Sequence, residues 1–299
     1  MLRAWRSSLG AGLLVTLYCL CVSAQALVLQ DDRRVQVTIQ HAPQRIVSLL
    51  PSHTETVCVL GQCQKLVGVD RYSNWPAQVA QLPRLGGGID PNIESVVALK
   101  PDLVLMATSA RGAERLEALG VKVLALEPRT HADVQRVLRV VAQALFVPVQ
   151  ESDRVWQHID AAVNAAAQSV PASAKGQRVY VEVSPTPHGA SEASFMGETL
   201  QRLGARNVLP ASMGPFPQVN PEWVVRAQPD LILVADSQAE RMRARPGWSN
   251  LRAVRLQQVC VFKPDASDVL VRAGPRMAEA ARLLAECLVR KGASEQAGR

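Results

Sequence analysis

A helix–strand pattern occurs twice in this chain, once in each half. Residues 92–105 read NIESVVALKPDLVL and residues 220–233 read NPEWVVRAQPDLIL. Each segment begins with Asn, has Glu two positions later, continues as an apolar helix to Pro-Asp, and ends as an apolar strand. Repetition through both elements favours two pseudo-equivalent lobes. The alternative is that the two segments are unrelated and share only the residues that commonly begin and end helices and strands.

The rest of the chain extends this alternation. Strands are expected at residues 45–50, 66–69, 103–106 and 121–126, and again at 179–183, 231–235 and 259–262. Helices are expected at residues 93–99, 113–119, 195–203, 221–227 and 275–289. Ser52 has capping-box spacing to Glu55, which predicts that it caps a further short helix ending at Gly61. Strands alternating with helices predict parallel, mostly buried sheets and therefore an α/β fold.

The middle of the chain has a helical pattern instead. Apolar residues recur at intervals of three and four from residue 132 to 169, with an interruption near Pro148. No Gly/Ser-rich stretch is present, so we expect a stiff helical connection rather than a flexible linker. The predicted organisation is an N-terminal lobe at 27–130, a helical linker at 131–170 and a C-terminal lobe at 171–299.

The first 26 residues have the three parts of a secretory signal peptide. Arg3 and Arg6 give a positive start, residues 9–22 are apolar, and Ala24-Gln25-Ala26 is a small-x-small cleavage site. A retained membrane anchor is the alternative, but the run is shorter than the roughly 20 residues that span a bilayer as a helix. We expect cleavage after Ala26 and a periplasmic mature protein.

Four cysteines remain in the expected mature chain. An exported protein meets an oxidising compartment, where an even number of cysteines favours disulfides. The simplest pairs are Cys58–Cys63 and Cys260–Cys287, although the connectivity stays open at this point. A zinc site is the rival interpretation, and the C-x4-C spacing fits zinc poorly.

Charge and motifs favour neither nucleic-acid binding nor catalysis. The formal net charge of +7 becomes +5 without Arg3 and Arg6, and the remaining charges are interspersed. The sequence has no nucleophile-elbow, dinucleotide-binding or P-loop motif. Ser52 and His53 resemble a nucleophile and its base, but sequence neighbours seldom have triad geometry. We therefore expect a protein that is not an enzyme and has no cofactor or metal site of its own, with an exported hydrolase as the less favoured alternative.

Loops after the predicted strands supply the candidate ligand-binding residues, because such loops meet at one rim of a parallel sheet. Aromatic faces and the fixed donor fork of arginine suit a large, flat ligand with polar edges. For Tyr72, ordinary loop packing is an equal alternative. His53 and His188 are also candidate axial ligands for a metal that the ligand carries. The candidates are Ser52, His53, Tyr72, Gly87, Gly88, Thr108, His188, Phe216 and Arg272.

Glu94 and Glu222 occupy the start of the two repeated helices. An acid in the first helical turn is stabilising by a few tenths of a kcal/mol, which is the structural interpretation. As one exposed acid in each lobe, the pair also suits salt bridges to arginines of a symmetric partner.

Several segments together resemble the helical-backbone (class III, cluster A) substrate-binding proteins of ABC importers. They are RIVSLLPSHTE, LVGVDRYSNWP, NIESVVALKPDLVL, GPFPQVNPEWVVRAQPDLILV and GPRMAEAARLLAECL, within residues 45–288. The resemblance implies two Rossmann-like lobes joined by a single long helix, with the ligand cleft between the lobes. It also implies that Glu94 and Glu222 dock onto permease arginines, and that aromatic ligand contacts lie near Tyr72 and Phe216.

Within this class, the cobalamin-binding branch is the most similar. The implied function is capture of cobalamin or a related corrinoid by a monomeric protein, followed by delivery to an ABC permease dimer in the inner membrane. The chain departs from that branch at Gly87, Gly88, Ala107 and Thr108, where those relatives have tryptophans. Haem or a ferric siderophore is the alternative cargo. A free-metal receptor would need several converging histidines and acids, a pattern that the sequence does not suggest.

Overall fold

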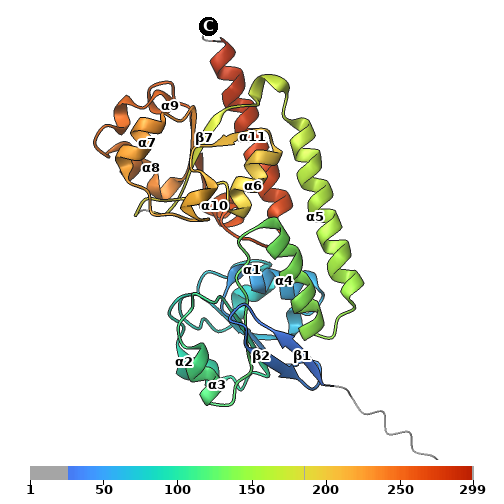
Figure 1. The fold of residues 1–299 in the computed structure, drawn as a ribbon. Coiled ribbons are helices and arrows are strands. Elements are labelled where there is room, and N and C mark those ends of the chain that lie inside the picture. The colour runs from blue at the N-terminus through green and yellow to red at the C-terminus, as the bar shows by residue number, and fades with distance from the viewer. Residues whose placement is uncertain (1–25, 185, 298–299) are drawn as a thin grey trace, which may run out of the picture.

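The computed structural model describes residues 26–184 and 186–297 and has two lobes connected along one flank by a long helix (Figure 1). The predicted signal peptide, with Cys19 and Cys21, lies outside the described residues apart from Ala26. No helix in the described part of the chain combines the length and the apolar character that crossing a bilayer requires.

The N-terminal lobe is built on a parallel four-stranded sheet with strand order β4-β3-β5-β6. All residues of β3, β5 and β6 are buried, as the continuous apolar runs predict. An antiparallel hairpin, β1–β2, adds to this lobe. The strands are β1 Leu27–Gln30, β2 Gln36–Ile39, β3 Ile46–Ser48, β4 Leu66–Val69, β5 Leu103–Met106 and β6 Val123–Ala125.

The C-terminal lobe contains a second sheet with order β11-β10-β7-β8, in which β9 also pairs with β7. Strands β11, β10, β7 and β9 are parallel, and β8 is antiparallel to β7. The strands are β7 Arg178–Ser184, β8 His188–Gly189, β9 Arg206–Asn207, β10 Leu231–Ala235 and β11 Val259–Phe262.

Helices cover the faces of both sheets. In the N-terminal lobe and the middle they are α1 Pro51–Val59, α2 Ile93–Ala98, α3 Ala113–Ala118, α4 His131–Ala144 and α5 Val149–Ser169. In the C-terminal lobe they are α6 Phe195–Arg202, α7 Pro221–Ala227, α8 Asp236–Arg243, α9 Arg252–Arg255, α10 Pro264–Leu270 and α11 Met277–Ala297. Short 3₁₀ helices lie at η1 Cys63–Lys65, η2 Ala77–Gln81, η3 Ala172–Ala174, η4 Ala211–Met213 and η5 Trp248–Asn250.

The predicted capping role of Ser52 is wrong. Helix α1 begins one residue earlier, with Leu50 at the N-cap and Pro51 in the first helical position. Proline is favoured there because its fixed φ suits a helix and its missing N–H is not needed. Ser52 therefore lies inside the first turn, and its carbonyl oxygen accepts from Thr56 Oγ1 at 2.7 Å.

The two repeated segments form equivalent parts of the two lobes, α2–β5 and α7–β10. The aspartate of each Pro-Asp pair accepts a backbone N–H at the start of the neighbouring strand. Asp102 accepts from Arg45 and Asp230 accepts from Arg178, both at 2.9 Å. Each repeat therefore joins its own strand to the next one in the same way, which gives a physical reason for keeping Pro-Asp in both lobes.

The helical middle is an antiparallel pair of helices rather than one rod. Helix α4 begins beside α6, where His131 Nε2 lies 2.8 Å from Thr199 Oγ1, and the chain reverses at residues 145–148. Helix α5, about 30 Å long at 1.5 Å per residue, then packs on α4, α6 and α11 (Figure 1). Helix α4 contributes to both lobes: Val134 and Leu138 belong to the core of the C-terminal lobe, whereas Val137 and Val141 belong to that of the N-terminal lobe.

Both expected cysteine pairs are at disulfide distance. The sulfurs of Cys58 and Cys63 are 1.98 Å apart, and this bond joins the end of α1 to η1. The sulfurs of Cys260 and Cys287 are 2.05 Å apart, and this bond joins β11 to α11.

Candidate functional site

Two adjoining cavities lie where the lobes face each other. The smaller one, about 340 Å³, has walls from both lobes, including Ser52 and Glu127 on one side and Phe195 and Phe216 on the other. The larger one, about 530 Å³, extends into the C-terminal lobe at the carboxyl ends of β7, β10 and β11. Tyr72, Asp268 and Val271 line both cavities. Their position at the strand ends follows from the parallel sheets.

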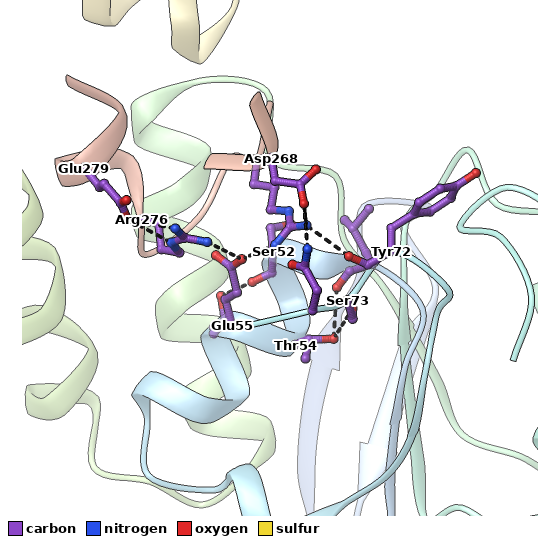
Figure 2. Close-up of polar contacts among 12 residues, drawn as sticks. Ser52, Thr54, Glu55, Tyr72, Ser73, Asp268, Arg276 and Glu279 are labelled. Atoms are coloured by element: carbon purple, nitrogen blue, oxygen red, sulfur yellow. Dashed lines mark hydrogen bonds and ion pairs between the residues drawn. The ribbon is translucent and has the colours of Figure 1, made fainter. Parts of the chain in front are cut away.

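Four predicted ligand-binding residues line these cavities. Ser52, Tyr72, Phe216 and Arg272 all form part of the smaller cavity. Tyr72 is 59% exposed. Its ring extends away from the polar residues around its backbone, as Figure 2 shows. Phe216 packs edge-to-face on Phe195 at 6.0 Å between ring centroids. Two aromatic side chains, one from each lobe, therefore border the space where a flat ligand would fit.

The remaining predicted residues lie around the cavities rather than on their walls. Thr108 donates to Glu127 Oε2 at 2.9 Å, and so supports a cavity residue. Gly87 lies against the guanidinium group of Arg71, where a Cβ would come within 3.3 Å of it. Gly88 lies against the carbonyl oxygen of Leu49.

The structure does not support either histidine as a cavity residue. His53 is fully buried in α1, because the helix begins at Pro51 and turns that side chain into the lobe. Burial lowers the pKa of His53 to about 4, so its ring is neutral at physiological pH. His188 is half-buried, and its Nδ1 lies 2.7 Å from the carbonyl oxygen of Thr186. Neither ring lines the two cavities.

Arg272 reaches the cavity wall, but its donors are already engaged. It is 5% exposed and pairs with Glu55 Oε1 at 2.7 Å and with Asp268 Oδ2 at 2.9 Å. It also donates to the backbone carbonyl oxygen of Tyr72 at 3.0 Å. Arg272 therefore lines the smaller cavity, while partners within the protein use its donor fork.

Acidic side chains dominate the charge of the cavities. Glu127 and Asp268 line the smaller cavity, and Glu182, Asp236 and Asp268 line the larger one. Among the described residues on both walls, Arg272 is the one cation. Glu182 is 4% exposed and is held by an ion pair with Arg245. A site of this kind presents oxygen acceptors and lacks an unpaired cation for an anionic ligand.

Several cavity residues were missed by sequence reasoning. They are Glu127, Glu182, Phe195, Gln238 and Asp268. Glu127 follows β6 and Glu182 lies near the end of β7, so the rule of strand carboxyl ends could have found both. Gln238 is 8% exposed, and its buried Oε1 has no hydrogen-bond partner. Within the described residues, no three His, Cys, Asp or Glu side chains gather as a metal ion would require.

Two α/β lobes, a long connecting helix and a cavity between the lobes define a two-lobed solute-binding protein. Residues 46–266 match the family model described as periplasmic binding protein, and the chain belongs to this family. It is an exported substrate-binding protein of an ABC transporter, which takes a small-molecule ligand and works with a permease. The family and its relatives are solute-binding proteins and not enzymes.

Two curated relatives cover most of the chain. One is the uncharacterized ABC transporter substrate-binding lipoprotein YvrC of Bacillus subtilis, which is 30% identical over 88% of this chain and 85% of that protein. The other is the vitamin B12-binding protein of Salmonella typhimurium, also 30% identical, over 83% of this chain and 91% of that protein.

Solved structures share the fold. The periplasmic heme-binding protein RhuT from Roseiflexus sp. RS-1 superimposes with a TM-score of 0.71 at 26% identity, covering 83% of this chain and 99% of that chain. The periplasmic vitamin B12-binding protein BtuF of Vibrio cholerae superimposes with a TM-score of 0.68 at 24% identity, covering 83% and 98%. These similarities agree with the predicted two-lobed class III architecture.

Proposed function

We propose that this protein captures cobalamin or a related corrinoid and delivers it to the permease of an ABC importer. The similarity to vitamin B12-binding proteins supports this cargo. The observation that carries the proposal is the acidic lining of the two cavities, in which Arg272 is the single cation and is already paired.

The acidic lining of the cavities suits the two candidate cargoes, a corrinoid and haem, to different degrees. A corrinoid is rimmed by amide groups, whose N–H donors suit carboxylate and carbonyl acceptors. Haem carries two propionates, which would lie near Glu127 or Asp268 without an unpaired cation on the cavity walls. Bringing like charges together in a partly desolvated groove is unfavourable, and this favours the corrinoid.

Haem is the second candidate, and one observation favours it. Tyr72 places an exposed phenol at the border of both cavities. A tyrosine oxygen is one of the protein ligands that haem iron accepts. The similarity to RhuT, a heme-binding protein, also supports this candidate.

Calorimetry with purified mature protein tests the cargo. We expect cyanocobalamin to bind with a dissociation constant in the micromolar range or below, and haemin to bind more weakly. A ferric hydroxamate is the third ligand in the series. Tighter binding of haemin, with a shift of its Soret band, would overturn the corrinoid assignment and leave the transport class unaffected.

Glu94 and Glu222 are the proposed docking residues for the permease. Each is exposed in the first turn of its helix, after an asparagine that caps the helix. Helices α2 and α7 lie on the same flank of the molecule, opposite α5 (Figure 1). Glu94 pairs with Arg115 at 2.7 Å, but both side chains are largely exposed, so this pair would yield readily to a partner's arginine.

The proposed mature chain starts at Leu27, after cleavage following Ala26, and is a monomer. Strand β1 begins at Leu27, so the mature N-terminus would enter the N-terminal lobe directly. The intact mass of periplasmic protein checks the cleavage, and light scattering of the same sample checks the monomer. A lipid-modified or longer N-terminus would contradict the proposed site.

A further inference from the structure

A buried polar contact joins the lobes beside the cavities. Residues 271–276 of the C-terminal lobe lie on the first turn of α1, and Figure 2 shows the side chains that meet there. We call this contact the interlobe clamp and define it as Glu55 of the N-terminal lobe with Asp268, Arg272 and Arg276 of the C-terminal lobe.

The centre of the clamp is the ion pair between Glu55 and Arg272, both of which are buried. Glu55 is fully buried, and its Oε1 pairs with Arg272 at 2.7 Å and with Arg276 at 3.9 Å. Burial raises the pKa of Glu55, and the two guanidinium groups act against that rise. Arg276 also pairs with Glu279 at 2.9 Å and lies over the ring of Trp75, 5.2 Å from its centroid.

The clamp also holds the loop that carries Tyr72. Arg272 donates to the Tyr72 carbonyl oxygen, and Asn74 Nδ2 donates to Asp268 Oδ2 at 2.7 Å. From within the N-terminal lobe, Asp70 accepts from the Tyr72 backbone N–H at 2.7 Å. The backbone of Tyr72 is therefore fixed from both lobes, whereas its ring remains exposed to the cavities.

The lobes approach closely at one further point in the clamp region. A Cβ added to Gly274 would lie 3.0 Å from Ser52 Cβ and 3.4 Å from its carbonyl oxygen. This contact is tighter than ordinary packing, so a side chain at residue 274 would press on Ser52 at the start of α1. The spacing between the lobes is therefore set by backbone contact as well as by charge.

We propose that Arg272 is a positioning residue for ligand capture. Through Glu55 it holds the two lobes at a fixed spacing, and through the Tyr72 carbonyl it orients the ring that faces the ligand. Moving the lobes apart at this point would break the buried Glu55–Arg272 pair, so opening must either pivot about the clamp or give up that contact. The role of Tyr72 as a ligand contact rests on the proposed function, whereas the fixed lobe spacing does not.

Spin-label distances in the ligand-free protein test the lobe spacing directly. Labels at Glu114→Cys and Glu240→Cys place one exposed site in each lobe. We expect a narrow distance distribution for the otherwise wild-type protein and a broader or displaced one for Arg272→Gln. Arg282→Gln removes an exposed ion pair from α11 and is the matched control, with no change expected.

Two further variants separate positioning from simple loss of stability. Gly274→Ala leaves every charge in place and should still alter the distance distribution. If Arg272→Gln does not fold, this variant tests whether the contact sets the spacing between the lobes. Glu55→Gln/Arg272→Gln removes both charges of the buried pair together, and this variant should also show a broadened distribution. Unchanged distances in Gly274→Ala and in the folded charge variants would overturn the proposal.

Ligand release gives an independent readout. We expect cyanocobalamin to dissociate about tenfold faster or more from Arg272→Gln, because the loop that carries Tyr72 would no longer be held in place for the ligand, and effects of this kind act mainly on the dissociation rate. Arg272→Lys restores one contact of the three and should recover part of the effect. If cyanocobalamin does not bind the wild-type protein, the corrinoid assignment fails while the distance measurement still decides the clamp.

Discussion

At the scale of single residues, burial decides which chemistry a side chain retains. His53 and Tyr72 both follow a strand of the N-terminal lobe, but His53 is enclosed by the lobe and Tyr72 borders the cavities. Arg272 is as buried as a core residue, and its charge is paired with Glu55 and Asp268.

His53 should make the protein sensitive to acid. Its pKa is about 4 in the folded state and 6.5 in its ordinary state, so the unfolded chain binds more protons between these values. The stabilising contribution is complete above pH 6.5 and is lost as the pH falls towards 4, by about 3 kcal/mol. Urea unfolding of the wild type and of His53→Gln across this range measures the difference. Parallel pH curves for the two proteins would rule out this origin.

Tyr72→Ala should weaken corrinoid binding without weakening the fold. Tyr72 is 59% exposed, so removal of its ring leaves no cavity in a core. Loss of one aromatic contact costs about 1 kcal/mol, which corresponds to roughly five- to tenfold in the dissociation constant. Leu119→Ala, at an exposed apolar residue of the same lobe, is the control and should bind normally. Calorimetry and thermal unfolding of both variants check the two halves of the prediction.

At the scale of elements, local patterns predicted the strands of both sheets well. The strands at 66–69, 103–106, 231–235 and 259–262 have the predicted bounds. Each is a short apolar run bordered by turn residues, and these residues mark where the strand begins or ends. The hairpin β1–β2, the strands β8 and β9 and the helices α8, α9 and α10 were not predicted. Their short segments contain too few periodic positions, and packing against the rest of the molecule decides their structure.

The two disulfides should contribute unequally to stability. The Cys260–Cys287 bond closes a longer loop than the Cys58–Cys63 bond, with sequence separations of 27 and 5. In the chain-entropy description this corresponds to about 3.5 and about 2 kcal/mol. Replacing each pair by serine and measuring denaturant unfolding tests the order. Thiol titration of the denatured, unreduced wild type should detect no free thiol in the mature chain, and four free thiols would refute the pairing.

At the scale of the whole molecule, the arrangement of the lobes places the two repeated helices on one flank (Figure 1). Helices α2 and α7, whose first turns contain Glu94 and Glu222, both lie on the side of the molecule opposite α5. A partner with two-fold symmetry could therefore contact both acids at once.

Reversing the charge of both docking acids should abolish delivery while leaving capture intact. We expect Glu94→Lys/Glu222→Lys to bind cyanocobalamin normally, because neither residue lines the cavities. Uptake by cells that depend on this protein should fall to background, because each lysine would repel a permease arginine. Glu114→Lys/Glu240→Lys makes the same charge change at exposed acids of α3 and α8 and should transport normally. Loss of ligand binding together with uptake in the first variant would contradict a docking role.

The sequence alone was enough for the two-lobed α/β plan, the stiff helical middle and the strand-end loops, because hydrophobic periodicity, helix signals and repetition are local properties. The tertiary structure alone decided the roles of Arg272 and His53. Arg272 meets Glu55 across 217 residues of chain, and His53 becomes neutral only when the lobe encloses it. Partners and solvent exposure of this kind arise from packing between distant segments, and no local pattern encodes them.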